Sequence, residues 1–401
     1  MGFLSSLFGK KAAAQPEAAP EDEVSEETQP GVPTAELAQG LDEREGAVRV
    51  DAARALIERW RTGDGQAAEV IAPRLEELLD DDEALVRLAA LSGVRLLRKP
   101  ENLERCASGV LALLADPVAQ VRTAAIWAAI RLPGDAARTQ VRALLKSTEE
   151  PMRFAAACAL SDVRDAAALP ELQEALRDGH RRQEALSAIM SLGDAAALPA
   201  IGALFEDEGL GEFDRTLVAA ALARFGDERG ALHLTERISS ESDDRPIAAE
   251  WAGRLGVQQA VPALSELADA EGDLARGAAM RALGRLRAPG AEERLLNLAG
   301  DADEAEDLRM DAAEGLAELG TPPALELLKS IADGEPDDLS KLCKELLAEI
   351  ALNQAAAAQA AAAPSASAAA PDPSAAAAAP GASDAPPDPS TATTEPPEDR
   401  G

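Results

Sequence analysis

Apolar residues recur along the middle of the chain with the spacing of amphipathic helices, in pairs separated by short acidic turns. The second helix of each pair reads approximately V-R-x-x-A-A-x-A-L-x-x-L-G, as in QVRTAAIWAAIRL and LRMDAAEGLAELG. One hairpin of this kind cannot bury its apolar face alone, so the pattern predicts a stack of helical hairpins. Nine arginines anchor the pattern at separations of 29 to 38 residues: Arg49, Arg87, Arg122, Arg153, Arg182, Arg215, Arg245, Arg276 and Arg309.

Composition supports an all-α fold. Hydrophobic residues make up 46% of the chain, yet aromatic residues make up 2% and tyrosine is absent. The apolar mass is alanine and leucine, which have high helix propensity, whereas a sheet needs more β-branched and aromatic residues. Glycine is predicted to cap second helices in the left-handed conformation, and proline to begin first helices. These residues are Gly193, Gly226, Gly256 and Gly320, and Pro170, Pro199 and Pro262.

The segments ALPELQEALRDGHRRQEALSAIMSLGDAA and VPALSELADAEGDLARGAAMRALGRL resemble HEAT repeats of the short bacterial type, similar to those of phycobilisome-lyase-like proteins. The resemblance covers about residues 34–354. It implies a right-handed α-solenoid of about 9–10 helical hairpins, with the second helices lining a concave surface. It also implies that each anchoring arginine bonds a carboxylate or carbonyl in an inter-helix turn, forming a structural ladder along the stack. This repeat serves many roles, so the resemblance says little about function.

The two ends of the chain differ from the repeats. Residues 1–11 predict a short amphipathic segment whose apolar stripe could tether the chain weakly to a membrane or to a second partner. A disordered start is the alternative. The stripe consists of Phe3, Leu4, Leu7 and Phe8. Residues 12–33 predict a disordered acidic linker and residues 355–401 a disordered tail rich in alanine and proline. The alanine runs after residue 354 are able to prolong the last helix.

The net charge of −33 belongs mainly to the repeats, because the two ends carry only −4 and −5. Such a surface repels phosphate backbones, which argues against nucleic acid as a partner. Counting 100° per residue from each anchoring arginine predicts which side chains face away from the core. That face holds seven arginines: Arg54, Arg95, Arg131, Arg224, Arg254, Arg281 and Arg285. The last five are candidate partner-binding residues for an acidic peptide, and a salt-bridged, solvated face is the alternative.

Large apolar residues occupy the same outward positions in three consecutive early repeats. An exposed aliphatic and aromatic row would mark a partner-binding site. The alternative is that each side chain leans onto the neighbouring repeat. The candidates are Leu88, Trp127, Ile130 and Phe154.

No active site is recognisable in the sequence. His180 and His233 lie in different repeats, and neither begins the His-Glu pair with which deoxyhypusine hydroxylase, a HEAT enzyme, binds iron. No phosphate-binding glycine loop, G-x-S-x-G motif or cysteine with a plausible base occurs. The three cysteines read as buried core thiols in a reducing compartment. We therefore expect no catalytic residue, no metal and no cofactor.

These observations predict a non-enzymatic scaffold that binds a protein or peptide on the concave face of a HEAT solenoid. Two alternatives stay open, a lyase-like HEAT protein that handles a bilin or other chromophore, and a peripheral membrane adaptor tethered by residues 2–11. We expect a monomeric bacterial protein of the cytoplasm, with a peripheral inner-membrane location under the last alternative.

Overall fold

The computed structural model describes residues 32–270 and 272–362, with side chains to residue 354. The chain divides into two units, Met1–Leu347 and Ala348–Gly401. Every regular element among the described residues is a helix. Unit 2 is described only where it contains the end of the last helix, and the repeats belong to unit 1.

The helices pair into ten hairpins within the described residues. First helices are α1 (Thr34–Gly40), α3 (Gly65–Ile71) continued by α4 (Leu75–Leu78), α6 (Pro100–Ala112), α8 (Asp135–Leu144), α10 (Leu169–Ala175), α12 (Leu198–Phe205), α14 (Glu228–Ser239), α16 (Val261–Asp269), α18 (Ala291–Gly300) and α20 (Pro322–Ala332). Second helices are α2 (Gly46–Arg61), α5 (Ala84–Val94), α7 (Ala119–Ala129), α9 (Glu150–Asp162), α11 (Arg182–Leu192), α13 (Glu212–Arg224), α15 (Arg245–Leu255), α17 (Arg276–Arg285), α19 (Glu306–Leu319) and α21 (Asp338–Ala362). Helix α21 therefore continues past residue 354 into the alanine run, which has high helix propensity.

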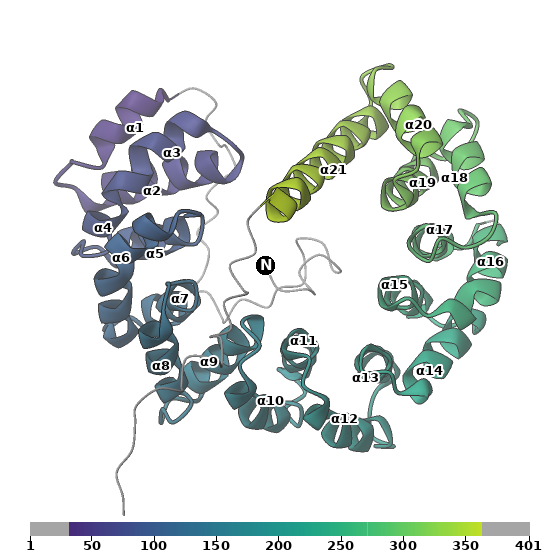
Figure 1. The fold of residues 1–401 in the computed structure, drawn as a ribbon, viewed down its shortest axis with the longest axis horizontal. Helices are drawn as coiled ribbons and strands as arrows, with labels where there is room; N and C mark the ends of the chain where they lie inside the picture. The colour runs from purple at the N-terminus through teal and green to yellow at the C-terminus, as the bar shows by residue number, and fades with distance from the viewer. Residues whose placement is uncertain (1–31, 271, 363–401) are drawn as a thin grey trace, which may run out of the picture. The chain divides into compact units, whose positions relative to one another are not determined.

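The second helices from α2 to α19 form the inner row of the stack. Each packs against the second helix before it and the one after it. In Figure 1 the helices α5, α7, α11, α13, α15, α17 and α19 lie inside the first helices, which we call the outer row. This succession of nearest-neighbour contacts is the architecture of an α-solenoid. The all-α solenoid predicted from the repeat period is thereby confirmed.

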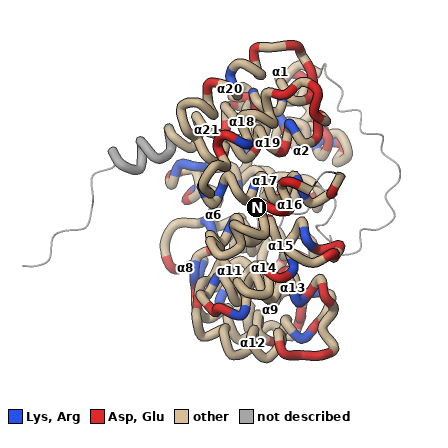
Figure 2. Tube along the Cα trace, turned by 90° about the vertical axis from the view of Figure 1, so that its right-hand side faces the viewer, with Lys and Arg blue, Asp and Glu red and all other residues tan. Residues whose placement is uncertain are grey.

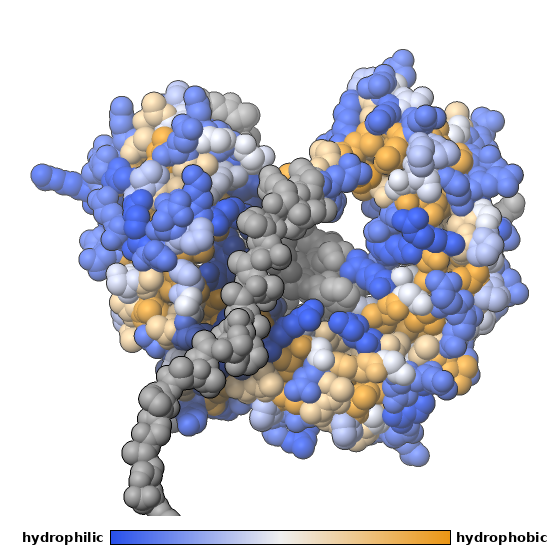
Figure 3. Space-filling model, viewed as in Figure 1, coloured by the Kyte–Doolittle hydropathy of each residue, from blue (hydrophilic) through white to orange (hydrophobic). Residues whose placement is uncertain are grey.

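Alanine and leucine fill one continuous core between the two rows. Helix α9 buries nine of its residues, five of them alanine or cysteine in the run Ala155–Ala159, so small side chains let neighbouring helices approach. Hydrophobic residues show along the seams between helices in Figure 3, and hydrophilic residues cover much of the outer row. In Figure 2 Asp and Glu occupy many turns along one edge of the stack. Acidic side chains are thus frequent in the turns as well as in the helices.

The local caps follow the sequence closely. All four predicted glycines have positive φ, with values between 61° and 80°. The three prolines lie in the first turn of α10, α12 and α16. An aspartate after the cap then accepts a hydrogen bond from a backbone N–H of the next first helix at Asp165, Asp194 and Asp227. Each hairpin therefore ends and begins by local chemistry.

Two arginines occupy the cap position that glycine holds elsewhere. Arg164 has a φ of 55° and Arg287 a φ of 49°. Each follows a second helix, as Gly193, Gly226 and Gly256 do in the three repeats between them. A side chain in this conformation costs energy, because Cβ approaches the following carbonyl oxygen.

Candidate functional site

The anchoring arginines lie at the edge where second helices begin, and most of them join two successive turns. The guanidinium of Arg49 donates to the carbonyls of Glu43 and Arg44 at 3.1 and 3.0 Å and to both carboxylate oxygens of Asp81 at 2.8 Å. Asp81 belongs to the turn of the following repeat. Arg182, Arg245 and Arg276 also reach a carboxylate of the following repeat. These contacts connect each turn to the next.

The most buried member of this ladder is the pair of Arg87 and Asp116. Two hydrogen bonds of 2.8 and 3.1 Å join the guanidinium to the carboxylate. Burial alone would raise the pKa of Asp116, but the hydrogen bonds from Arg87 and from the Val118 backbone hold that pKa below its ordinary value. Arg122 extends the series, with its guanidinium bonded to the Asp116 carbonyl at 2.9 Å and paired with Glu149. The arrangement is structural, because its charges are used within the chain.

Three ladder arginines depart from the rule. Arg153 pairs with Glu171 of α10, at 3.2 Å. Arg215 bonds only backbone carbonyls among the described residues, and Arg309 donates to the Ala299 carbonyl at 3.3 Å. The acid that would continue the series from Arg215 is Asp244, and it instead accepts hydrogen bonds from Thr216 and Arg237. Bonding to carbonyls replaces the ion pair at Arg215 and Arg309.

The inner row near its C-terminal end carries a closed network of charges around Glu250. The Glu250 carboxylate is 7% exposed, contacts Arg254 at 2.8 Å and Arg281 at 3.7 Å, and also pairs with Arg285. Burial would raise the pKa of Glu250, yet Arg285 and Arg254 leave that pKa lowered. The candidate residues Arg254, Arg281 and Arg285 therefore all hold carboxylates of their own chain.

Further acids complete this network from α19. Arg281 also contacts Asp311 and Glu314, and Arg285 contacts Glu318 at 3.0 Å. Desolvation, together with repulsion from Glu250, raises the pKa of Glu314 although Arg281 attracts it. A partner's carboxylate would have to displace these groups before it could bind the same arginines. In this half of the inner row the described contacts follow the salt-bridged alternative.

The residues of the predicted apolar row differ in burial between the two ends of the row. Phe154 is 6% exposed, and the Arg181 guanidinium lies over its ring at 4.8 Å from the centroid. Exposure of Phe154 is thus ruled out, because α9 packs this side chain into the core. Leu88, Trp127 and Ile130 are half-buried and pack against the core with part of each side chain accessible. The outward row is therefore limited to α5 and the end of α7.

Arginines beside these apolar residues are exposed. Arg95 and Arg98 follow α5, Arg131 follows α7, and Arg224 ends α13. Within the described part of the chain none of the four guanidinium groups makes a hydrogen bond or an ion pair. Arg98 was missed by the sequence reasoning, because it lies in a turn outside the helical pattern used to assign the inner face.

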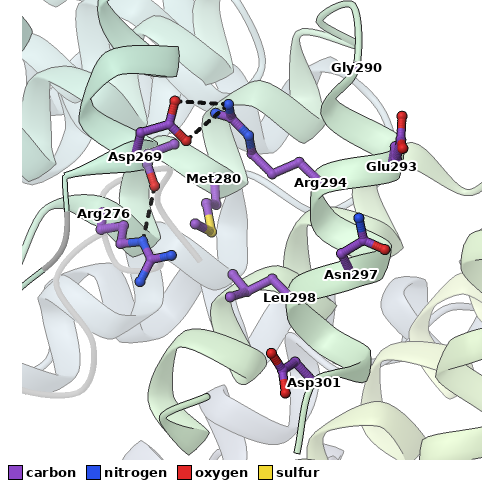
Figure 4. Close-up of a pocket in the computed structure, with 10 residues that line it drawn as sticks. Asp269, Arg276, Met280, Gly290, Glu293, Arg294, Asn297, Leu298 and Asp301 are labelled. Atoms are coloured by element: carbon purple, nitrogen blue, oxygen red, sulfur yellow. Dashed lines mark hydrogen bonds and ion pairs between the residues drawn. The ribbon is translucent and has the colours of Figure 1, made fainter. Parts of the chain in front are cut away.

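A pocket of about 430 Å³ lies between α16, α17 and α18. Figure 4 shows Met280 and Leu298 near its centre, with charged side chains around them. Asp269 and Arg294 pair at 3.0 Å, and Arg276 belongs to the ladder. This pocket was not predicted, since its residues come from three helices whose meeting is tertiary. Because Arg294 and Arg276 are paired with carboxylates of the chain, we assign this pocket to the packing between repeats.

The titratable residues typical of catalysis are scattered. His233 packs edge-on against Phe205, and burial lowers its pKa. All three cysteines are buried, and burial raises the pKa of Cys343 to about 11, which leaves the thiol protonated at neutral pH. The residues that the structure describes contain no group of three metal-ligating side chains able to hold an ion. None of its described helices is long and apolar enough to cross a membrane.

The proposed tether lies outside the described residues. Phe3, Leu4, Leu7 and Phe8 belong to the segment 1–31, for which no structure is described. The tether therefore stays a prediction.

Comparisons with known proteins follow the same lines as the fold. The family model of HEAT repeats matches residues 107–193 and 261–348. A search of curated proteins finds no match. Among solved structures, the chain is similar to the CpcE–CpcF complex of phycocyanin lyase from Nostoc sp., with 16% identity over 78% of this chain and 98% of that chain and a TM-score of 0.35.

Two further similar structures come from different functional classes. Human deoxyhypusine hydroxylase in complex with glycerol has 22% identity over 61% of this chain and 96% of that chain, with a TM-score of 0.27. Computationally designed armadillo repeat proteins for modular peptide recognition have 22% identity over 48% of this chain and all of that chain, with a TM-score of 0.34. No activity or ligand transfers at these levels. The two matched segments are HEAT repeats, and the ten stacked hairpins of the described residues form an α-solenoid that contains them.

Proposed function

We propose that this protein is a non-enzymatic scaffold that binds a protein or peptide partner on its inner row. One observation carries the proposal. Leu88, Trp127 and Ile130 are half-buried on α5 and α7, with accessible apolar surface next to exposed arginines. Large apolar side chains of this kind, above all tryptophan, anchor protein interfaces. Charged groups beside them then set orientation and partner choice.

The test is affinity purification of partners with the full chain, compared between the wild type and Trp127→Ala. We expect a stoichiometric partner that is lost on Trp127→Ala, because the indole supplies the anchor. Leu232→Ala is the matched control, since Leu232 is an exposed apolar residue of the outer row. Leu88→Ser serves as a second variant, and thermal unfolding shows that both variants stay folded. If folded Trp127→Ala and Leu88→Ser variants both retained the partner, the proposed binding site on the inner row would be wrong.

The two other functions are read from the same purification. A coloured bound tetrapyrrole would favour the lyase-like alternative. For the membrane adaptor, deletion of residues 2–11 is expected to release the protein from membranes, and an unchanged distribution would contradict it. We place the scaffold first, because the described residues offer it an accessible surface.

A further inference from the structure

Three arginines follow the C-terminal ends of α5 and α7, two helices that pack against each other, and we call them the arginine cluster. They are Arg95, Arg98 and Arg131, and all three are exposed. Arg95 caps the C-terminus of α5, Arg98 follows in the turn before α6, and Arg131 follows α7. The cluster therefore joins two adjacent repeats of the inner row. Because the cluster lies beside the proposed partner-binding residues, a ligand assigned to it rests on the proposed function.

The charges of the cluster repel one another. Partial desolvation and then repulsion from Arg98 and Arg95 lower the pKa of the Arg131 guanidinium, although arginine stays charged at any physiological pH. None of the three guanidinium groups forms a hydrogen bond or an ion pair with a described residue. The contrast lies in the same helices, because Arg87 of α5 and Arg122 of α7 are both paired with carboxylates.

No acid among the described residues forms an ion pair with this cluster. Asp162 at the end of α9 is attracted by the charge of Arg95. Burial raises the pKa of Asp162, and attraction to Arg95 offsets only part of that rise. Asp135, at the start of α8, lies instead at 4.0 Å from Arg138. On a chain with a net charge of −33, three unpaired neighbouring cations form a local site for an anion.

The apolar residues beside the cluster restrict the kind of anion. Leu88 and Arg95 are seven residues apart on α5, and Trp127 and Arg131 are four apart at the end of α7, so each pair shares one helix face. A ligand that reaches the arginines therefore passes accessible apolar surface. A long polyanion such as DNA or RNA would also meet the acidic turns of the stack, which repel phosphates. A short acidic segment with apolar side chains meets only the cluster and its apolar neighbours.

We propose that the arginine cluster, with Leu88, Trp127 and Ile130, binds an acidic peptide segment that carries bulky apolar side chains. Each guanidinium can accommodate a carboxylate with two parallel hydrogen bonds, which gives direction as well as attraction. The apolar side chains of the peptide pack on the half-buried surface of Trp127 and Leu88. The site belongs to repeats two and three, away from the closed network around Glu250.

The experiment uses a random peptide library displayed on phage and selected on the full chain. We expect the selected peptides to be enriched in Asp and Glu next to Leu, Phe or Trp. For the strongest one, synthesised with a fluorescent label, Arg131→Glu should weaken affinity by about tenfold or more, since a lost charge-assisted hydrogen bond is of that size. Added salt should weaken binding as well. Arg44→Glu is the matched control, because Arg44 is exposed and its guanidinium is unpaired within the described residues.

The outcomes separate this inference from the proposed function. Arg131→Glu removes no hydrogen bond or ion pair of the described residues and relieves the repulsion from Arg98 and Arg95, so the variant should melt no lower than the wild type. Selection of peptides without acidic residues, which bind the Arg131→Glu variant as well as the wild type but do not bind Trp127→Ala, would overturn the acidic ligand. It would still support the inner-row binding site. Equal loss on Arg44→Glu would point to a general charge effect and overturn the cluster. Failure to select any peptide would overturn this inference, whereas the purification of a protein partner tests the proposed function separately.

Discussion

The ladder arginines gain their role from reach, since one guanidinium can satisfy both its own turn and the turn of the next repeat. Arg87 donates to the Asp81 carbonyl at 2.8 Å while it holds Asp116 of the following repeat. Arg87 and Asp116 lie 29 residues apart in sequence. The planar fork of arginine suits this double contact, and lysine would lose one half of it. The acids before each anchoring arginine thus serve the repeat that precedes them.

We expect Asp116→Asn to lower the free energy of local unfolding of α5 and α7 by about 3 kcal/mol at neutral pH, because it leaves a buried guanidinium without its counter-charge. Native-state hydrogen exchange of these helices measures the loss. The control is Asp135→Asn, which makes the same substitution on a carboxylate with a 93% exposed side chain. A loss equal in both variants would contradict a special role for the buried pair.

The same pair predicts a pH dependence. The folded-state pKa of Asp116 is lowered, so its contribution to stability is complete above the unfolded pKa of about 4 and is lost as pH falls through the folded value. The difference between wild type and Asp116→Asn should therefore be constant from neutral pH down to mildly acidic pH and then shrink. A difference that grows on acidification would show the opposite sign.

Arginine in the left-handed cap position gives a second test at this scale. We expect Arg287→Gly to raise stability by about 0.5–1 kcal/mol, because the relief of strain exceeds the extra chain entropy that glycine brings to the unfolded state. The melting temperature is the measurement. Gly320→Ala, at a φ of 61°, makes the reverse change and should lower it. A fall in melting temperature for Arg287→Gly would reveal a contact of Arg287 that outweighs the strain.

Helices of the inner row approach each other through glycine at the C-terminal end of the stack. A Cβ on Gly253 would lie 2.7 Å from the Cα of Ala282, and one on Gly284 would lie 2.6 Å from the Gly315 carbonyl oxygen. These glycines come from α15 and α17, so consecutive repeats use the same device. Their backbones approach more closely than any side chain would allow.

Gly284→Ala should therefore force α17 and α19 apart and lower stability by about 2 kcal/mol, the size expected when a packed core is overfilled. The urea midpoint of unfolding measures the effect. Gly65→Ala is the control, because a Cβ at that helical position meets nothing within 4 Å. Alanine there should be neutral or stabilising, since it favours helix. Equal midpoints for the two variants would disprove the close approach.

In the molecule as a whole, repeats of unit 1 contact only their neighbours, so energy is exchanged locally along the stack. The destabilisation from Gly284→Ala should for that reason appear in the hydrogen exchange of α15, α17 and α19 and leave α2, α5 and α7 unchanged. A uniform loss of protection would mean that the solenoid unfolds as one unit. This locality also allows one part of the inner row to carry a binding site while another serves stability.

The hairpins and their caps were determined by sequence alone. Apolar spacing specifies each helix, and Gly193 followed by Asp194 specifies how one hairpin ends and the next begins, because these contacts join residues close in the chain. The anchoring arginines were also identified from the sequence, since one of them recurs in each repeat.

Tertiary structure alone decided which of these side chains are buried or paired within the chain. Glu250 meets Arg285 only because α15 stacks on α17, so sequence could not show that the arginines near it are paired. Phe154 occupies an outward position in the pattern, yet the packing of α9 buries it. Arg98 lies outside any helical pattern, and its neighbourhood with Arg131 exists only across two repeats. The physical reason is the same throughout, because local patterns specify elements, whereas burial and ion pairing depend on which elements meet.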